Sequence, residues 1–189
     1  LSFRIVPDAP SSNYNGNTYI DTMSREATSR FIELTHEQYK KHCGDRFGSS
    51  IKGFFTDEPH RGHAMDDLKK ENGTVTCSMC WTDDFFEEFR SRCGYDAKAV
   101  LPELFYRKDG ERFAPIKHDW FDVADNLFLE RFAMPINDWC NENGLSFTGH
   151  VLHEDSLTNQ SVPHGSLMRF YEYMAIPGVD VLSDGNYFY

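Results

Sequence analysis

Two kinds of hydrophobic pattern alternate along this chain. Short apolar runs rich in β-branched and aromatic residues predict buried strands, and longer stretches with an apolar residue every three or four positions predict amphipathic helices. The strands are expected at 2–6, 51–56, 145–152 and 179–182. The helices are expected at 24–44, 82–94, 97–105, 119–144 and 166–175, and Pro135 should kink the fourth of them.

The order of these elements is strand, helix, strand, two helices, strand, helix, strand, which indicates parallel strands joined by right-handed crossovers. An open doubly wound sheet and part of a (β/α)8 barrel both fit. The barrel is favoured because no Gly-rich phosphate loop follows any strand, whereas acids and histidines do. A whole barrel needs about 250 residues. We therefore expect residues 1–189 to be a segment, about half, of one (β/α)8 TIM-barrel catalytic domain.

The formal net charge of -11 argues against a nucleic-acid partner, which would need clustered Lys and Arg. No apolar run approaches the roughly 20 residues of a membrane-spanning helix. A sugar or another polar ligand suits this chain better. It begins "LSFRIV", with neither an initiator Met nor a signal peptide, so we expect a piece excised from a larger multidomain protein and leave localisation open. Open strand edges predict self-association of the fragment.

Five cysteines give an odd count, and only Cys77 and Cys80 ("CSMC") have motif spacing. A structural zinc site would need a second pair, and a redox C-x-x-C usually opens a helix. We interpret this pair as loop thiols, with a thiol-based redox or metal protein as an alternative.

The first candidate site follows the strand at 51–56, in "TDEP". Glu58 can be partly desolvated at a barrel mouth and serve as a general acid. Asp57 should point to the other side of the strand, so the two carboxylates would have separate roles, one facing the cavity and one supporting a loop. A plain polar loop entry is the alternative.

The second candidate site is "FTGHVLHEDS". If the strand continues, His150 and Glu154 lie on one side and His153 on the other. Gly149 permits close approach of a ligand to the backbone. His150 could bind a sugar hydroxyl, and Glu154 could be a second acid or base. Metal binding by the two histidines and Glu154 is disfavoured, since their spacing fits no helical zinc motif.

Together these sites fit glycoside hydrolysis, which uses two carboxylates on either side of the scissile bond. Glu58 and Glu154 end two strands that would share one barrel mouth, with Glu58 favoured as the acid because its strand is more apolar. Trp81 could stack on a sugar, and Asp184 ends the last strand. "YEYM", which contains Tyr171, is interpreted as helical core.

Four blocks of the sequence resemble large bacterial glycoside hydrolases of the α-L-rhamnosidase-like family 106 and their relatives. The blocks occur in order and span nearly the whole chain: "YIDTMSREATSRFIELTHEQYKKHCGDRFGSSIKGFFTDEP", "WTDDFFEEFRSRCGYD" followed by "LPELF", "RFAMPINDWCNENGLSFTGHVLHEDS" and "MRFYEYMAIPGVDVL". Related barrels with β-galactosidase-like activity have similar sequence segments.

The resemblance implies a (β/α)8 catalytic domain that hydrolyses a terminal glycosidic bond, with Glu58 and Glu154 as its acid/base pair. His150, His153, Asp57, Trp81 and Asp184 would bind substrate or support the site. An inverting mechanism belongs to characterised members, and calcium to some of them. The chain departs from the family by carrying "TCSMC" and by lacking the rest of the barrel. A non-catalytic or degenerate carbohydrate-binding barrel is the main alternative.

Overall fold

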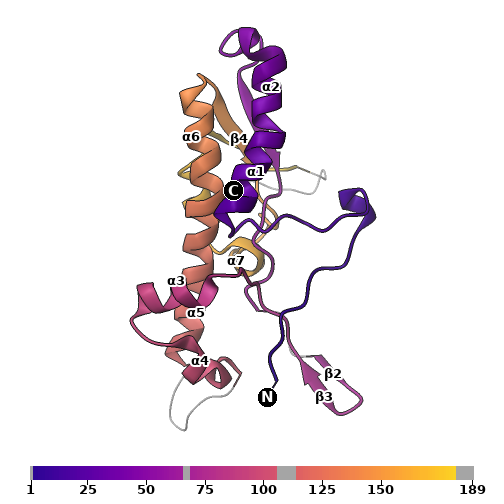
Figure 1. The fold of residues 1–189 in the computed structure, drawn as a ribbon, viewed down its shortest axis with the longest axis vertical. Coiled ribbons are helices and arrows are strands. Elements are labelled where there is room, and N and C mark those ends of the chain that lie inside the picture. The colour runs from indigo at the N-terminus through magenta and orange to yellow at the C-terminus, as the bar shows by residue number, and fades with distance from the viewer. Residues whose placement is uncertain (1, 66–68, 106–113, 182–189) are drawn as a thin grey trace.

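A small parallel sheet organises the chain (Figure 1). The structure, a computed structural model, describes residues 2–65, 69–105 and 114–181. The strands lie in the order β1 (Gly53–Asp57), β4 (Ser146–His150) and β5 (Ile176–Pro177), and both neighbouring pairs are parallel. Gly53 lies beside Ser146 and Asp57 beside His150, so β1 and β4 end at the same level. Parallel pairing is confirmed, whereas the described strands do not close a barrel.

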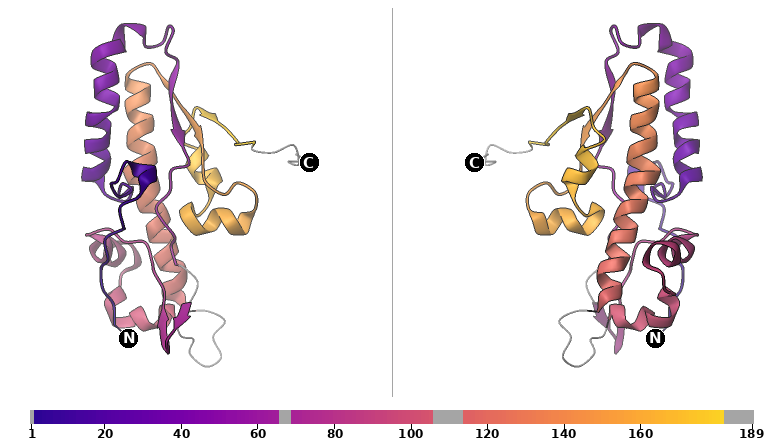
Figure 2. Two further views of the ribbon diagram at one scale, coloured as in Figure 1. Left: turned by 90° about the vertical axis from the view of Figure 1, so that its right-hand side faces the viewer. Right: turned by 90° about the vertical axis from the view of Figure 1, so that its left-hand side faces the viewer.

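One face of the sheet is covered by α1 (Arg25–Leu34), α2 (His36–Cys43) and α6 (Met134–Glu142), as Figure 2 shows. The Ser24 side chain caps α1 by accepting a hydrogen bond from the Ala27 N–H, as expected for an N-cap serine. Phe54 of β1 meets Trp139 of α6 edge to face, with ring centroids 5.4 Å apart. Helices that precede a strand and cover its face are typical of βαβ units.

The other face of the sheet has no such cover among the described residues. The exposed fraction of Phe55 is 64%, whereas its neighbour along the strand, Phe54, contacts the helices. Because side chains alternate along a strand, the outward face of β1 is the one that Phe55 and Asp57 share. The strand ends on this face at the acidic residue Asp57.

The longest helical stretch among the described residues runs on through Pro135, and a π-helical turn lies directly before that residue, where a kink was predicted. It consists of α5 (Pro115–Phe128), one π-helical turn (Leu129–Ala133) and α6. Pro135 lies in the first turn of α6. Proline has no N–H to bond the preceding turn and its ring crowds that turn's carbonyl. The wider π turn accommodates both effects directly before it.

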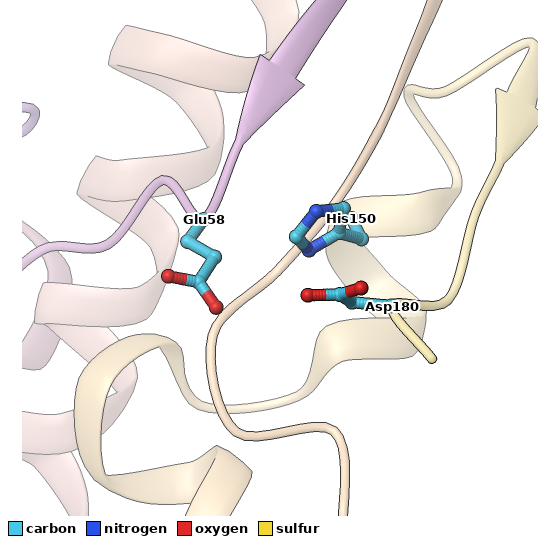
Figure 3. Close-up of side chains that lie close together, drawn as sticks. All are labelled: Glu58, His150 and Asp180. Carbon is cyan, nitrogen blue, oxygen red and sulfur yellow. The ribbon is translucent and has the colours of Figure 1, made fainter. Parts of the chain in front are cut away.

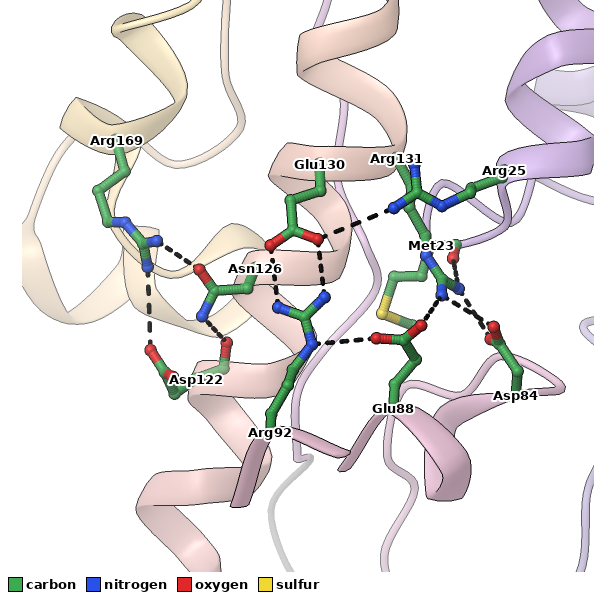
Figure 4. Close-up of polar contacts among 10 residues, drawn as sticks. All are labelled: Met23, Arg25, Asp84, Glu88, Arg92, Asp122, Asn126, Glu130, Arg131 and Arg169. Atoms are coloured by element: carbon green, nitrogen blue, oxygen red, sulfur yellow. Dashed lines mark hydrogen bonds and ion pairs between the residues drawn. The ribbon is translucent and has the colours of Figure 1, made fainter. Parts of the chain in front are cut away.

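The π turn carries Arg131 into a network of ion pairs, drawn in Figure 4. The Arg131 side chain is 3% exposed and donates to the Met23 carbonyl (2.8 Å), Asp84 (2.7 and 2.8 Å) and Glu88 (2.7 Å). A bidentate pair of Arg92 with Glu130, at 2.9 and 2.7 Å, adjoins it. The network fastens α3 and the segment before α1 to the long helix.

The end of the molecule opposite α2 holds α3 (Phe85–Cys93), α4 (Ala97–Val100) and a 3-10 turn, Leu101–Leu104 (Figure 1). Aromatic rings form its core, with Phe85 and Trp120 4.3 Å apart. An antiparallel hairpin, β2 (Lys69–Glu71) and β3 (Thr74–Thr76), protrudes beside it. The sequence analysis missed this hairpin because its strands are short and polar.

Several predicted boundaries were wrong. Residues 2–6 are not a strand; they are exposed, and Phe3 meets the ring of Phe105 at 5.9 Å. The last strand among the described residues lies at 176–177, ahead of the predicted 179–182, whose final residue lies outside the described ranges. Other elements are α7 (Leu157–His164), which was not predicted, α8 (Leu167–Tyr171), and 3-10 turns Ser12–Tyr14 and Gly44–Arg46. In the ranges that the structure describes, no helix has the length and apolarity to cross a membrane.

Candidate active site

Three ionisable side chains from separate elements converge at the carboxyl ends of β1 and β4 (Figure 3). They are Glu58, directly after β1, His150, the last residue of β4, and Asp180, after β5. One oxygen or nitrogen atom of each lies within 4.8 Å of the other two. Parallel strands bring their carboxyl ends to one edge, which is where α/β proteins build their sites. Glu58 and His150 were predicted for this edge and Asp180 was not.

The backbone of Glu58 explains why its carboxylate reaches His150. Its φ is +46°, in the left-handed region that residues with a side chain rarely adopt. This turn redirects the chain after β1, so Glu58 does not follow the alternation of the strand. Strained backbone of this kind concentrates at functional sites.

Asp57 also approaches His150. Asp57 and His150 are register partners, and their Oδ1 and Nε2 atoms are 3.2 Å apart. Asp57 remains exposed, while Glu58 is half-buried. The two neighbouring carboxylates therefore do not diverge to opposite sides of the strand, because both lie beside one imidazole. The separate roles expected for them stay a prediction.

His150 is the most enclosed member of the cluster, with 9% of the residue exposed. The ring of Phe55 meets it edge-on at 5.6 Å. Its Nδ1 atom is buried and has no hydrogen-bond partner among the described residues. A buried polar atom without a partner carries a desolvation penalty and calls for a functional explanation.

Gly149 allows two strands to pack closely. Its φ is +144°, and a Cβ built on it would collide with the backbone of Thr56 in β1. The missing side chain thus lets β4 approach β1, while the predicted close approach of a ligand stays a prediction. This close approach sets His150 beside Asp57.

Glu154 lies in the turn after β4, and both of its oxygens accept hydrogen bonds. Oε1 is 2.6 Å from the Tyr171 hydroxyl, and Oε2 accepts from the Asp180 backbone N–H at 2.8 Å. The Tyr171 hydroxyl is also 2.8 Å from the Gly178 carbonyl oxygen. Burial raises the pKa of Tyr171 above its usual range, and the hydrogen bond to Glu154 and its charge raise it further. Glu154 therefore holds the segment that carries Asp180.

The loop after Glu58 is fastened by a buried ion pair. Arg61 Nε donates to Asp125 Oδ1 at 2.8 Å, and Nη1 donates to the carbonyls of Gly62 and Val162 at 2.9 and 3.0 Å. Burial raises the pKa of Asp125, although the Arg61 charge opposes that rise. These bonds join the β1 loop to α7, which follows Glu154. Two strand-end segments are thereby tied together.

Three other predicted site residues are placed outside the cluster or not described. Trp81 packs against Phe85 and Phe86, with ring centroids 5.8 and 4.8 Å away. His153 is exposed, with a φ of +61°. Asp184 lies outside the described residues. Trp81 and His153 have no contact with the converging side chains among the interactions of the described ranges.

Cys80 does not have the properties of a reactive thiol. Cys43, Cys80, Cys93 and Cys140 form no disulfide among the described residues. Burial raises the pKa of the Cys80 thiol to about 11, whereas a reactive thiol needs a lowered one. The interpretation as thiols outside secondary structure fits residues 77–80.

The converging side chains can hold a divalent cation, but they fit calcium only in part. Calcium takes six to eight oxygen ligands. Glu58 and Asp180 supply carboxylates, whereas His150 supplies a nitrogen, and mixed imidazole and carboxylate ligands suit transition metals. The histidine and glutamate considered in the sequence analysis, His153 and Glu154, are not in this group.

Comparison with solved structures adds a likeness of fold. A rhamnosidase from Novosphingobium sp. PP1Y has a similar fold, with a TM-score of 0.58 and 21% sequence identity over 84% of this chain. The chain spans 14% of that protein's length. No family model matches the sequence. No curated protein is significantly similar to it. The likeness supports the α/β arrangement of parallel strands and helices.

Proposed function

We propose that this chain carries the catalytic carboxylates of a glycoside hydrolase that cleaves a terminal glycosidic bond, with an α-L-rhamnoside or a related sugar as substrate. The observation that carries the proposal is the convergence of Glu58, His150 and Asp180 where two parallel strands end, with Glu154 bound to the Asp180 backbone. The rhamnosidase likeness is consistent with it.

In the proposed reaction Glu58 is the general acid and Glu154 the general base. Glu58 gives its proton to the leaving oxygen as the glycosidic C–O bond breaks. Water attacks the anomeric carbon and gives a proton to Glu154. Glu154 suits the base because both of its oxygens accept hydrogen bonds, which hold its carboxylate in one orientation. His150 and Asp180 would bind sugar hydroxyls beside Glu58.

A carbohydrate-binding barrel without catalysis is the second candidate, and the same experiment separates the two. The protein that contains this sequence is assayed on a panel of aryl glycosides as wild type, Glu58→Gln and Glu154→Gln. We expect each variant to lose about 100- to 10,000-fold in kcat, the usual contribution of a general acid or base. Asp138→Asn, an exposed change on α6, is the matched control.

Full activity in either glutamine variant would remove that residue from the mechanism. Sugar binding by the wild type without turnover on any glycoside would favour the binding barrel instead.

A further inference from the structure

Tyr171 is a polar group beside Glu154 that has no part in the proposed reaction. It is the last residue of α8, and its ring is only partly buried. Its hydroxyl oxygen lies 2.6 Å from Glu154 Oε1 and 2.8 Å from the Gly178 carbonyl oxygen. A phenol has one proton, so it can donate to only one of these two acceptors at a time.

We propose that Tyr171 is a positioning residue that serves both protonation states of Glu154 and keeps Asp180 directed at Glu58 and His150. This inference rests on the proposed function, because it assumes that Glu154 gains a proton during the reaction.

When Glu154 is ionised, the Tyr171 O–H donates to Oε1 and the Asp180 N–H donates to Oε2. When Glu154 has accepted a proton from water, its new O–H donates to the phenol oxygen. The phenol O–H then turns to the Gly178 carbonyl, which has no other hydrogen-bond donor among the described residues. Once transferred, the proton stays on Glu154. The contacts of Tyr171 with Glu154 and with Gly178 keep the same heavy atoms in both protonation states.

The same contacts fix Asp180. Gly178 and Asp180 belong to the segment after β5. The Gly178 carbonyl contacts the Tyr171 hydroxyl, and the Asp180 N–H donates to Glu154. The Asp180 carboxylate is thereby held within 4.8 Å of the Glu58 and His150 ligand atoms (Figure 3). Tyr173, two residues after the end of α8, is also partly buried, but its hydroxyl has no hydrogen bond among the described residues. Tyr173 is therefore a matched control.

The first test compares Tyr171→Phe with Tyr173→Phe in the protein that contains this sequence. Tyr171→Phe keeps the ring, so circular dichroism should show an unchanged fold. We expect kcat to fall about 10- to 100-fold, the effect of losing a hydrogen bond to a charged group, with KM changed less than about threefold. Tyr173→Phe should leave both constants unchanged. Wild-type kcat in Tyr171→Phe would overturn the inference while Glu154→Gln, if inactive, would leave the proposed function standing.

The second test does not depend on activity. Tyrosine labelled with 13C at Cζ is titrated by NMR, and the Tyr171 signal is assigned by its absence in Tyr171→Phe. The hydrogen bond to Glu154 and its charge help to raise the Tyr171 pKa, so Glu154→Gln should lower that pKa. Hydrogen exchange at the Asp180 amide should also become faster in Tyr171→Phe and not in Tyr173→Phe. An unchanged Tyr171 titration in Glu154→Gln would refute the contact itself, whatever the enzyme's activity.

Discussion

Charged side chains gather in two regions of this molecule, and the two gatherings are built differently. Around Arg131, guanidinium groups and carboxylates alternate, so that each charge faces an opposite one (Figure 4). Around His150, the carboxylates of Asp57, Glu58 and Asp180 surround a single imidazole with no guanidinium or ammonium among their described contacts. The first arrangement stabilises the fold, whereas the second is the one to which we assign the proposed function.

The largest effect on stability is expected when the ion-pair network around Arg131 is broken. Arg131→Met removes a buried guanidinium and leaves the carboxylates of Asp84 and Glu88 without their main partner. We expect the free energy of unfolding to fall by about 2–3 kcal/mol, because hydrogen bonds between charged groups are lost while the remaining carboxylates stay partly solvated. Urea denaturation measures it.

Arg90→Met is the control for that change, because Arg90 pairs with Asp96 at 2.7 Å on the surface, with 65% of its side chain exposed. Its loss should cost less than about 1 kcal/mol. Similar losses in the two variants would contradict the distinction between a buried network and a surface pair.

An intermediate effect on stability is expected for His36, a structural imidazole that contrasts with His150 of the candidate site. His36 also has a buried Nδ1 without a described partner, but aromatic rings surround it, and Phe54 stacks on it at 4.5 Å. Burial lowers the pKa of His36 from 6.5 to about 4, and the charge of Glu37 offsets this only in part. The unfolded chain therefore takes up a proton at a higher pH than the folded chain does.

The stability that neutral His36 contributes is complete above about pH 6.5 and is lost as the pH falls towards about 4. We expect this to reduce the free energy of unfolding by roughly 1–3 kcal/mol between pH 7 and pH 4. His36→Phe should remove that part of the pH dependence. An equal pH dependence in both proteins, measured by urea denaturation, would show that His36 titrates normally.

The smallest effect on stability, together with a large effect on activity, is expected from a change among the carboxylates around His150. Asp180→Asn removes one of the like charges near Glu58. We expect the free energy of unfolding to rise by about 0–1 kcal/mol, since carboxylates a few ångströms apart repel weakly in a solvated site. Glycosidase activity should fall. Asp138→Asn, on the exposed side of α6, should change neither quantity. A clear loss of stability in Asp180→Asn would assign Asp180 to the fold instead.

The sequence predicted those parts of the fold that depend on local pattern. Apolar runs located β1 and β4, and Ser24 located the start of α1, because strand periodicity and capping are local signals. Residues 2–6 have the composition of a strand but no neighbouring strand in the structure, since pairing depends on distant residues.

The same distinction holds for the candidate site. Glu58 and His150 could be found because they follow predicted strands. Asp180 could not, because it reaches the site through hydrogen bonds to Glu154, 26 residues earlier in the chain. The left-handed backbone of Glu58 was equally hidden, since glutamate seldom adopts it. The Asp180 position has one signal in retrospect, an acid shortly after the turn residues Pro177 and Gly178.

The π turn at Leu129–Ala133 has a consequence for insertions and deletions in this chain. A π turn holds one more residue than an α turn, so it acts as a phase adjuster between the two halves of the long helix. Removing one residue there would restore an α turn and leave the phase of α5 and α6 nearly unchanged. Removing one residue from α5 while the π turn persists would instead rotate α6 by about 100° relative to the start of α5, and Ile136 and Trp139, now buried, would leave the core. The π turn is thus the place in this helix where the loss of one residue disturbs the packing least.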